Sequence, residues 1–245
     1  MIILGDIGNT ETKICLVKND KIIKKILIPS LGKKNHILNR YFNKFDFSKL
    51  EKILFCSVVP TTFKELKKYF KKKTSIKCHE LKELNLRSML KIDVNYKQVG
   101  SDRLANAISI SKKNKNFVIL DFGTATTFDV LIGKNYKGGI ISPGINLSLK
   151  TLSNKASLIP KINLKRMSKV IGKDTKSAVR SGFFWGYAGL IDNVINLIKK
   201  ETKKSFDVVI TGGFSKLFKN SIKTKTKQDF DITINGLIKA TKLIK

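Results

Sequence analysis

Two short turns whose residues could hold a metal-bound polyphosphate lie about 115 residues apart in the chain. The first is Asp6-Ile7-Gly8-Asn9-Thr10, and the second is Asp121-Phe122-Gly123-Thr124. Each follows an apolar run typical of a buried strand, residues 1–4 and 117–120, and each precedes another strand-like stretch. In such a turn the carboxylate can approach a cation. The glycine lets backbone N–H groups come close to phosphate oxygens, and the threonine hydroxyl donates a further hydrogen bond.

The repetition of this turn indicates how the chain is organised. Two such turns in matching contexts predict two similar half-domains that face one nucleotide. The alternative is that each is merely a tight turn after a strand, and the second copy in the same context favours the phosphate interpretation.

The elements that must position these turns also repeat. The first half opens with three expected strands, residues 1–8, 12–17 and 22–28, and the second half with residues 117–121, 126–132 and 137–141. Turn residues Asn19-Asp20 and residues 133–135 lie at matching places. The remaining expected strands are residues 53–59, 75–78 and 208–211, and the expected helices are residues 34–45, 61–70, 101–108, 144–152, 176–199, 215–219 and 236–243.

This pattern predicts an α/β protein of two similar lobes with a nucleotide cleft between them. We expect an N-terminal lobe of residues 1–115 and a C-terminal lobe of residues 116–245. No Pro- or Ser-rich linker separates them, so the boundary is a structural seam rather than a tether.

Composition excludes some classes of protein. The hydrophobic content of 42% is typical of a globular protein, no run is long enough to span a membrane, and the start lacks the features of a signal peptide. The cysteines are few and odd in number, which favours buried thiols in a reducing cytoplasm. Cys78-His79 lacks the further ligands of a zinc site.

The net charge of +31 raises the question of a nucleic-acid partner. The excess is almost entirely lysine spread along the chain, whereas specific phosphate and groove recognition favours arginine. We therefore expect solvated lysine-rich faces and no specific nucleic acid. Arginine occurs only at Arg40, Arg87, Arg103, Arg166 and Arg180.

Between the two turns, Gly100-Ser101-Asp102-Arg103 opens a helix, with Ser101 or Asp102 as a natural N-cap. A carboxylate at a helix start that is followed by an arginine is expected to have a low pKa.

Read together, the motifs resemble the type III pantothenate kinases. The resemblance runs in order from residue 6 to about residue 213, and the ordered set is far more specific than any one motif. The motifs are Asp6-Ile7-Gly8-Asn9-Thr10 with Lys13, Ser57-Val58-Val59-Pro60, Gly100-Ser101-Asp102-Arg103, Asp121-Phe122-Gly123-Thr124-Ala125-Thr126-Thr127, Gly138-Gly139 with Pro143-Gly144, and Thr211-Gly212-Gly213.

The resemblance implies the actin/Hsp70/sugar-kinase fold and transfer of the ATP γ-phosphate to pantothenate, the first step of coenzyme A synthesis. It also implies a homodimer, Mg²⁺ bound with ATP, a monovalent cation (K⁺ or NH₄⁺), and no membrane partner.

The resemblance also implies roles for individual residues. Asp102 is expected to be the general base, Asp121 the ligand of the monovalent cation, and Thr124 a second contact to ATP. Residues expected to bind ATP in the first turn are Asp6, Ile7, Gly8, Asn9, Thr10, Glu11, Thr12 and Lys13. Residues expected to contact pantothenate are Gly100, Ser101, Asp102, Arg103 and Thr175, and Gly212 and Gly213 are expected to let the backbone approach the adenosine.

Each role has a plainer alternative. Asp102 and Thr175 could simply cap helices, Arg103 could form a structural ion pair, and Lys13 could be a solvent-facing strand residue. Where the family has a tyrosine and a proline ahead of this segment, the chain reads Asp93-Val94-Asn95-Tyr96, and Tyr96 is a candidate to reach the same pocket from a shifted position.

Two other functions stay open on the sequence. One is another small-molecule kinase of the same fold, such as a sugar kinase, although no separate sugar-loop signature is present. The other is a basic nucleic-acid-binding regulatory protein, which the dispersed lysines disfavour.

Overall fold

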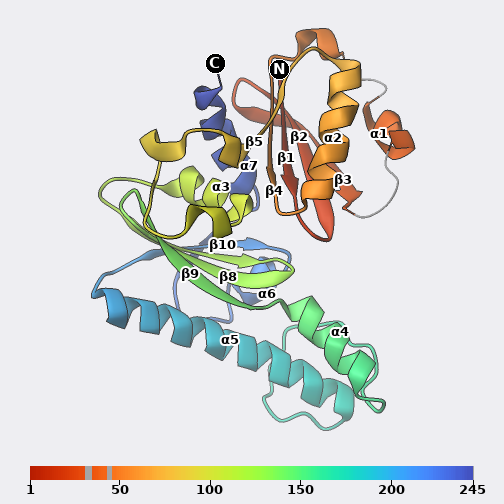
Figure 1. The fold of residues 1–245 in the computed structure, drawn as a ribbon. Helices are drawn as coiled ribbons and strands as arrows, with labels where there is room; N and C mark the ends of the chain where they lie inside the picture. Colours follow the sequence, from red (N-terminus) through yellow and green to blue (C-terminus); the bar gives the residue numbers. More distant parts are fainter. Residues whose placement is uncertain (31–34, 43–45, 245) are drawn as a thin grey trace. The chain divides into compact units, whose positions relative to one another are not determined.

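The doubled strand pattern of the sequence forms two sheets in a computed structural model of the chain (Figure 1). The structure describes residues 1–30, 35–42 and 46–244, with the backbone alone at residues 35–37. The chain divides into two compact units. Unit 1 contains Met1–Ser111, Lys134–Tyr136 and Asp231–Lys245, and unit 2 contains Lys112–Gly133 and Lys137–Phe230.

Unit 1 is built on a five-stranded sheet in the order β3-β2-β1-β4-β5. Strand β1 is antiparallel to β2 and parallel to β4, with Asp6 opposite Lys13 on one side and Cys56 on the other. The turn between β2 and β3 has Asn19 and Asp20 at positive φ, as expected of a tight hairpin. The strands are β1 (Ile2–Ile7), β2 (Glu11–Lys18), β3 (Lys21–Pro29), β4 (Lys52–Ser57) and β5 (Cys78–Glu80).

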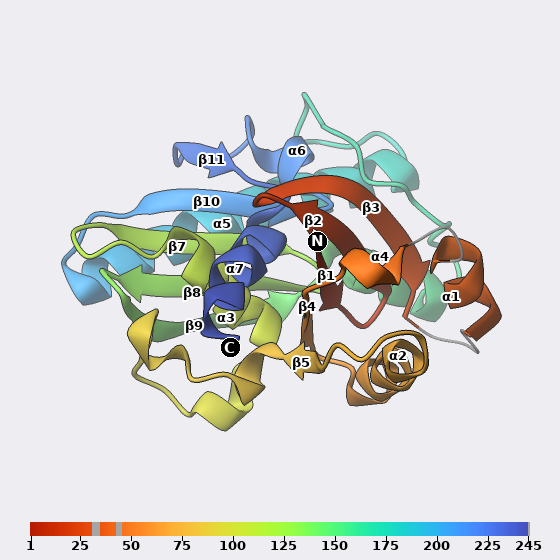
Figure 2. The ribbon, with the colours of Figure 1, turned by 90° about the horizontal axis from the view of Figure 1, so that it is seen from above.

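Helices cover both faces of this sheet. Because side chains alternate along a strand, Ile3 and Ile7 of β1 pack into one core with α1 (Asn35–Phe42) and α2 (Pro60–Lys73). On the other face α3 (Ser101–Ile110) and α7 (Ile232–Ala240) contact the central strands, and the two helices lie side by side (Figure 2). Asp6 alternates with Ile7, so its side chain lies on the face that α3 covers.

Short elements link β5 to α3. They are the 3₁₀ helices η2 (Leu81–Glu83), η3 (Leu86–Ser88) and η4 (Tyr96–Gln98), with the strand β6 (Lys91–Ile92) between them. β6 pairs in parallel with Asn135 and Tyr136, which belong to unit 1. Two further 3₁₀ helices are η1 (Phe47–Lys49) and η5 (Thr241–Leu243).

Unit 2 repeats the topology with the order β11-β10-β7-β8-β9. As in unit 1, the first strand is antiparallel to the second and parallel to the fourth. The strands are β7 (Asn116–Phe122), β8 (Ala125–Ile132), β9 (Asn135–Pro143), β10 (Asp207–Gly212) and β11 (Thr226–Gln228).

The long helix α5 (Thr175–Thr202) lies along one face of this second sheet (Figure 1). Its buried residues Phe184, Ile191 and Ile195 form a core with strand residues such as Val118 and Phe128. Two shorter helices complete the unit, α4 (Ile145–Lys155) and α6 (Ser215–Phe218).

The prediction of two similar α/β lobes is confirmed, and the cleft between them stays a prediction. The unit boundary differs from the predicted one. The seam lies after Ser111 rather than Lys115, and Asp231–Lys245 falls in unit 1 rather than in the C-terminal lobe. The physical reason is α7, whose apolar side chains are buried in unit 1 against α3.

Several predicted boundaries also move. Helix α3 begins at Ser101 with Gly100 as its N-cap, so the prediction of a Ser101 or Asp102 cap was wrong. Helix α7 begins four residues before the predicted Gly236, β5 begins at Cys78 where a strand was expected to end, and β11 was not predicted. The expected ends of the first helix, residues 34 and 45, lie outside the described residues.

Among the described residues, none of the helices combines the length and the apolar character needed to cross a bilayer.

Candidate active site

In unit 1 two predicted site residues, Asp6 and Asp102, lie at the carboxyl ends of β1 and β4. Asp6 is the penultimate residue of β1, Cys56 is its neighbour on β4, and Asp102 is the second residue of α3. The Cys56 thiol donates to Asp6 Oδ1 at 3.5 Å. Asp6 and Asp102 are both largely but not fully buried.

The carboxyl groups of Asp6 and Asp102 both have raised pKa values. Burial raises the pKa of Asp6 to about 6; the negative charge of Asp102 adds to this rise, and Lys13 opposes it. Burial also raises the pKa of Asp102, although the Arg103 backbone N–H, which donates to Asp102 Oδ1 at 2.8 Å, and the Arg103 guanidinium both lower it. The prediction of a low pKa for Asp102 was therefore wrong, because desolvation outweighs the helix start and the arginine.

Cys56 stays a thiol in this setting. Burial raises its pKa well above the ordinary value, and the charges of Asp6, Asp102 and Glu80 raise it further. A neutral thiol can keep donating to the Asp6 carboxylate. The residue pattern around Cys56 does not predict its contact with Asp6, because that contact depends on the register of β4 against β1.

Gly100 lies directly against the Asp102 carboxylate. A Cβ on Gly100 would overlap Asp102 Oδ1, because the carboxylate folds back over the start of its own helix. The turn that follows Asp6 is closed by the Gly8 N–H, which donates to the Glu11 carbonyl at 3.0 Å, and leaves Asn9 and Thr10 exposed. Exposed amide and hydroxyl groups next to a glycine can donate to an anion.

In unit 2 the second turn is closely packed by two glycines. Asp121 is the penultimate residue of β7, next to Thr211 of β10 in the sheet. Gly212 has a positive φ of 84°, and a Cβ there would lie 2.6 Å from both Asp121 Oδ1 and the Phe122 carbonyl oxygen. A Cβ on Gly144 would overlap the Thr124 carbonyl oxygen, so Pro143-Gly144 packs directly on the turn. Gly213, by contrast, has open space around it.

The donor atoms of this turn are hard oxygens. A carboxylate oxygen of Asp121 and the Phe122 carbonyl oxygen both lie against Gly212, and oxygen ligands suit potassium or magnesium better than softer metals. Within the described residues no group of three or more His, Cys, Asp and Glu side chains gathers to hold a metal by itself.

Two predicted residues have structural surroundings that were not expected. The N-cap of α5 is Asp174, whose carboxylate accepts the Ser177 N–H at 2.9 Å, so Thr175 is the exposed first residue of the helix rather than its cap. The Tyr96 hydroxyl donates to the Lys82 carbonyl at 3.1 Å, so the tyrosine joins η4 to η2 in the segment that precedes α3.

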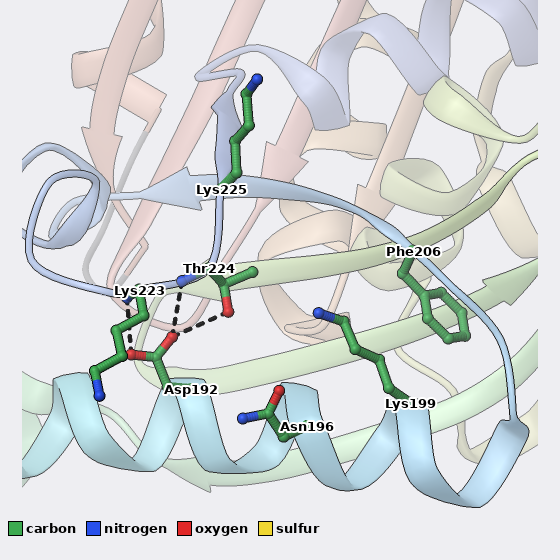
Figure 3. Close-up of a pocket in the computed structure, with 7 residues that line it drawn as sticks. All are labelled: Asp192, Asn196, Lys199, Phe206, Lys223, Thr224 and Lys225. Carbon is green, nitrogen blue, oxygen red and sulfur yellow. Dashed lines mark hydrogen bonds between the residues drawn. The ribbon is translucent and has the colours of Figure 1, made fainter.

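The cavity drawn in Figure 3, of about 390 Å³, contains none of the predicted site residues. It lies where β10 and β11 begin, whereas Asp121 and Gly212 lie where β7 and β10 end, and these strands are parallel. Its carboxylate, Asp192, accepts the N–H groups of Lys223 and Thr224 at 2.8 and 3.0 Å, so it fixes a loop (Figure 3).

Comparisons with known proteins agree with these motifs. Residues 2–197 match the family model described as type III pantothenate kinase. A type III pantothenate kinase of Pelagibacter ubique is 64% identical over 248 residues, covering 100% of both chains. One from a Sulfurihydrogenibium species is 36% identical over 90% of this chain and 91% of its own.

Solved structures share the fold at low identity. A Campylobacter jejuni protein assigned to the Baf family of transcriptional activators has a TM-score of 0.63 at 21% identity, covering 98% of this chain and 97% of its own. A Sinorhizobium meliloti protein assigned as a 2-dehydro-3-deoxygalactonokinase has a TM-score of 0.62 at 11% identity, covering 100% and 99%. The expected actin/Hsp70/sugar-kinase fold is confirmed by such neighbours.

Proposed function

This chain belongs to the type III pantothenate kinase family, and we propose that Asp102 is the base of its reaction. As a member of the family, the protein phosphorylates pantothenate with ATP, the first step of coenzyme A biosynthesis. The observation that carries the base assignment is the position of Asp102, at the start of α3 on the face of the sheet that also holds Asp6, with burial raising its pKa.

The proposed reaction moves one proton and one phosphoryl group. The primary hydroxyl oxygen of pantothenate attacks the γ-phosphorus of ATP, and its proton passes to an Asp102 carboxylate oxygen. The bond from the γ-phosphorus to the β–γ bridging oxygen breaks, and ADP leaves. Positioning and charge neutralisation supply most of the rate in such transfers. A raised pKa makes Asp102 a stronger base than a solvated carboxylate.

We assign ATP binding to the two turns. In the first, the exposed Asn9 and Thr10 donate to phosphate oxygens and Lys13 supplies positive charge; in the second, Thr124 donates. Asp6 fits the magnesium ion that accompanies ATP, because a buried carboxylate with a raised pKa gains most from a nearby cation. When bound, magnesium neutralises charge on the transferred phosphoryl group.

Asp121 is our candidate ligand for the monovalent cation. The support is the oxygen-rich corner against Gly212, in which no side chain would fit. When bound, potassium or ammonium supplies positive charge beside the nucleotide. Pantothenate contacts are assigned to Gly100–Arg103 and to Thr175.

A homodimer is the proposed assembly. Helices α4 and α5 of unit 2 form a mostly apolar groove of about 440 Å³ that includes Leu152, Phe183 and Leu190. A second copy of the chain would cover this apolar surface. Gly186 lines the groove with open space around it, so Gly186→Glu should yield a folded monomer in analytical ultracentrifugation. Asn193→Glu, an exposed position farther along α5, is the control and should leave the dimer intact.

A cytoplasmic location completes the proposal, and the three buried free cysteines support it.

The proposed function is tested by a coupled assay of ADP release with and without pantothenate, in potassium and in sodium. We expect release that requires pantothenate and is faster in potassium. Equal release without pantothenate, or release driven by a sugar in a substrate panel, would contradict the proposal.

A further inference from the structure

Two side chains of opposite charge hold the backbone on both sides of Gly100. Glu80 is the last residue of β5, and Lys82 is the middle residue of η2. Neither residue belongs to the motifs of the family resemblance, and both are partly buried in unit 1.

Glu80 is linked to Ser101, the residue after Gly100, through the backbone of Ser57. The Ser57 N–H, at the end of β4, donates to Glu80 Oε1 at 3.3 Å and to Ser101 Oγ at 2.7 Å. The Ser101 hydroxyl donates back to the Ser57 carbonyl at 3.1 Å, so Glu80 and Ser101 meet at the backbone of Ser57. The other oxygen, Glu80 Oε2, accepts the Lys82 N–H at 2.6 Å. Glu80 and Ser101 therefore tie the first turn of α3 to the end of β4.

Lys82 binds the residues before Gly100. Its ammonium group donates to the Val99 carbonyl at 2.9 Å and to the Lys97 carbonyl at 3.1 Å. The same ammonium group lies 5.1 Å from the centre of the Tyr96 ring, whose hydroxyl donates back to the Lys82 carbonyl. Lys82 therefore holds the chain that enters α3 through two hydrogen bonds and one contact with an aromatic ring.

We propose that Glu80 and Lys82 act as a clamp that positions the Asp102 carboxylate, an inference that rests on the proposed function of Asp102. The clamp holds Val99 directly on one side of Gly100 and Ser101, through Ser57, on the other, and Asp102 Oδ1 lies against Gly100. The direction of the Asp102 side chain is thus set by backbone that the clamp fixes. A displacement of about 1 Å can slow a reaction by about 100-fold. Because Glu80 and Lys82 act through the backbone around Gly100, they are positioning residues rather than catalytic ones.

The chain offers a matched control for this clamp. Glu83 lies on the same 3₁₀ helix, accepts the Glu80 N–H at 3.3 Å and pairs with Lys67, and its side chain is 45% exposed. The contacts of Glu83 are with Glu80 and Lys67, not with Val99 or Ser101 on the two sides of Gly100. Glu83→Gln changes the same charge on the same element and should leave kcat unchanged.

The experiment measures kcat, KM and thermal stability in the full-length protein. For Glu80→Gln we expect kcat to fall about 10-fold with KM for ATP unchanged, because the amide keeps the size but cannot accept from both Ser57 and Lys82. Lys82→Met should have a similar effect, and Lys82→Arg should restore most of kcat. Equal losses of kcat in Glu80→Gln and Glu83→Gln would overturn the clamp.

A double-mutant cycle separates positioning from general stability. In the Asp102→Asn background, Glu80→Gln should lower the residual rate by less than about 2-fold, because its effect acts through Asp102. A full 10-fold further loss would overturn the inference.

Hydrogen exchange provides a readout independent of activity. The amides of Ser57 and Arg103 should exchange faster in Glu80→Gln than in the parent or in Glu83→Gln, and unchanged exchange would overturn the clamp. A failure of the proposed function is distinguishable, since it appears in the unmodified protein as ADP release that does not require pantothenate.

Discussion

At the scale of single residues, the account depends on two carboxylates placed close together in a partly buried corner. Burial raises the cost of ionising both carboxylates, and the charge of Asp102 raises that of Asp6 further. A folded protein keeps such an arrangement at a cost in stability, and active sites commonly do so.

That cost can be measured through Asp6. The pKa of Asp6 in the folded state, about 6, lies above the ordinary 3.8, so the folded state holds this proton more tightly than the unfolded state. The stability that this proton contributes is fully present below pH 4 and is lost as the pH rises through 6. The free energy of unfolding of Asp6→Asn should therefore be about 2–3 kcal/mol higher than that of the parent at pH 8. At pH 4 the two values should be nearly the same. Urea unfolding without ATP or divalent metal checks this. A gain of equal size at both pH values would rule out Asp6 as its source.

Gly212 and Gly213 form a second test at this scale. Gly212→Ala places a Cβ against Asp121 at a positive φ, so we expect a loss of about 1–3 kcal/mol of stability and at least a 10-fold weaker activation by potassium. Gly213→Ala has open space around it and should keep both stability and potassium activation. Potassium titrations and thermal melts distinguish the two. Identical behaviour of the two variants would argue against a cation site at Asp121.

Candidate residues for the site could be proposed from the sequence, but their electrostatics could not be predicted. Gly100–Arg103 and the two aspartate turns are recognisable from residue type and order. The pKa of Asp102 depends on how much protein surrounds it, and the thiol contact to Asp6 depends on the register of β4 against β1. Both are properties of tertiary packing, which local patterns do not encode.

At the scale of elements, the repeated strands were predictable and the last helix was only partly so. Continuous apolar runs predict β1 and β7, because consecutive residues of these strands are buried on both faces of the sheet. Helix α7 opens with Ile232-Thr233-Ile234, a β-branched run that does not favour a helix on propensity alone. Its contact with α3 in unit 1 stabilises it, and this contact joins parts of the chain about 130 residues apart.

The crossing of α3 and α7 gives a prediction about stability. A Cβ on Gly236 would overlap the Ala105 carbonyl oxygen, so Gly236→Ala must push the two helices apart. We expect a loss of about 2–3 kcal/mol. Gly189→Ala, in α5 with open space around it, should instead gain about 0.5–1 kcal/mol from helix propensity. Chemical unfolding of both variants checks the contrast, and a stable Gly236→Ala would mean that the helices are not closely packed.

At the scale of the whole molecule, the two units share one topology, and the chain carries a net charge of +31. The charge is spread over many lysines and attracts anions in general. We expect binding to duplex DNA to be independent of sequence and to weaken by about 10³-fold or more between 50 and 200 mM salt. Fluorescence anisotropy at several salt concentrations measures this. Nanomolar, sequence-selective binding at physiological salt would indicate a regulatory role that the kinase account does not include.

The central claim is that Asp102 accepts the proton of pantothenate, and the most direct test is the turnover of Asp102→Asn. The asparagine keeps the size of the side chain at the start of α3 but cannot take a proton at neutral pH. We predict that kcat falls by about 10²–10⁴-fold while the affinity for ATP and the thermal stability stay close to those of the parent. A variant that binds ATP and retains kcat within about 3-fold of the parent would contradict the account.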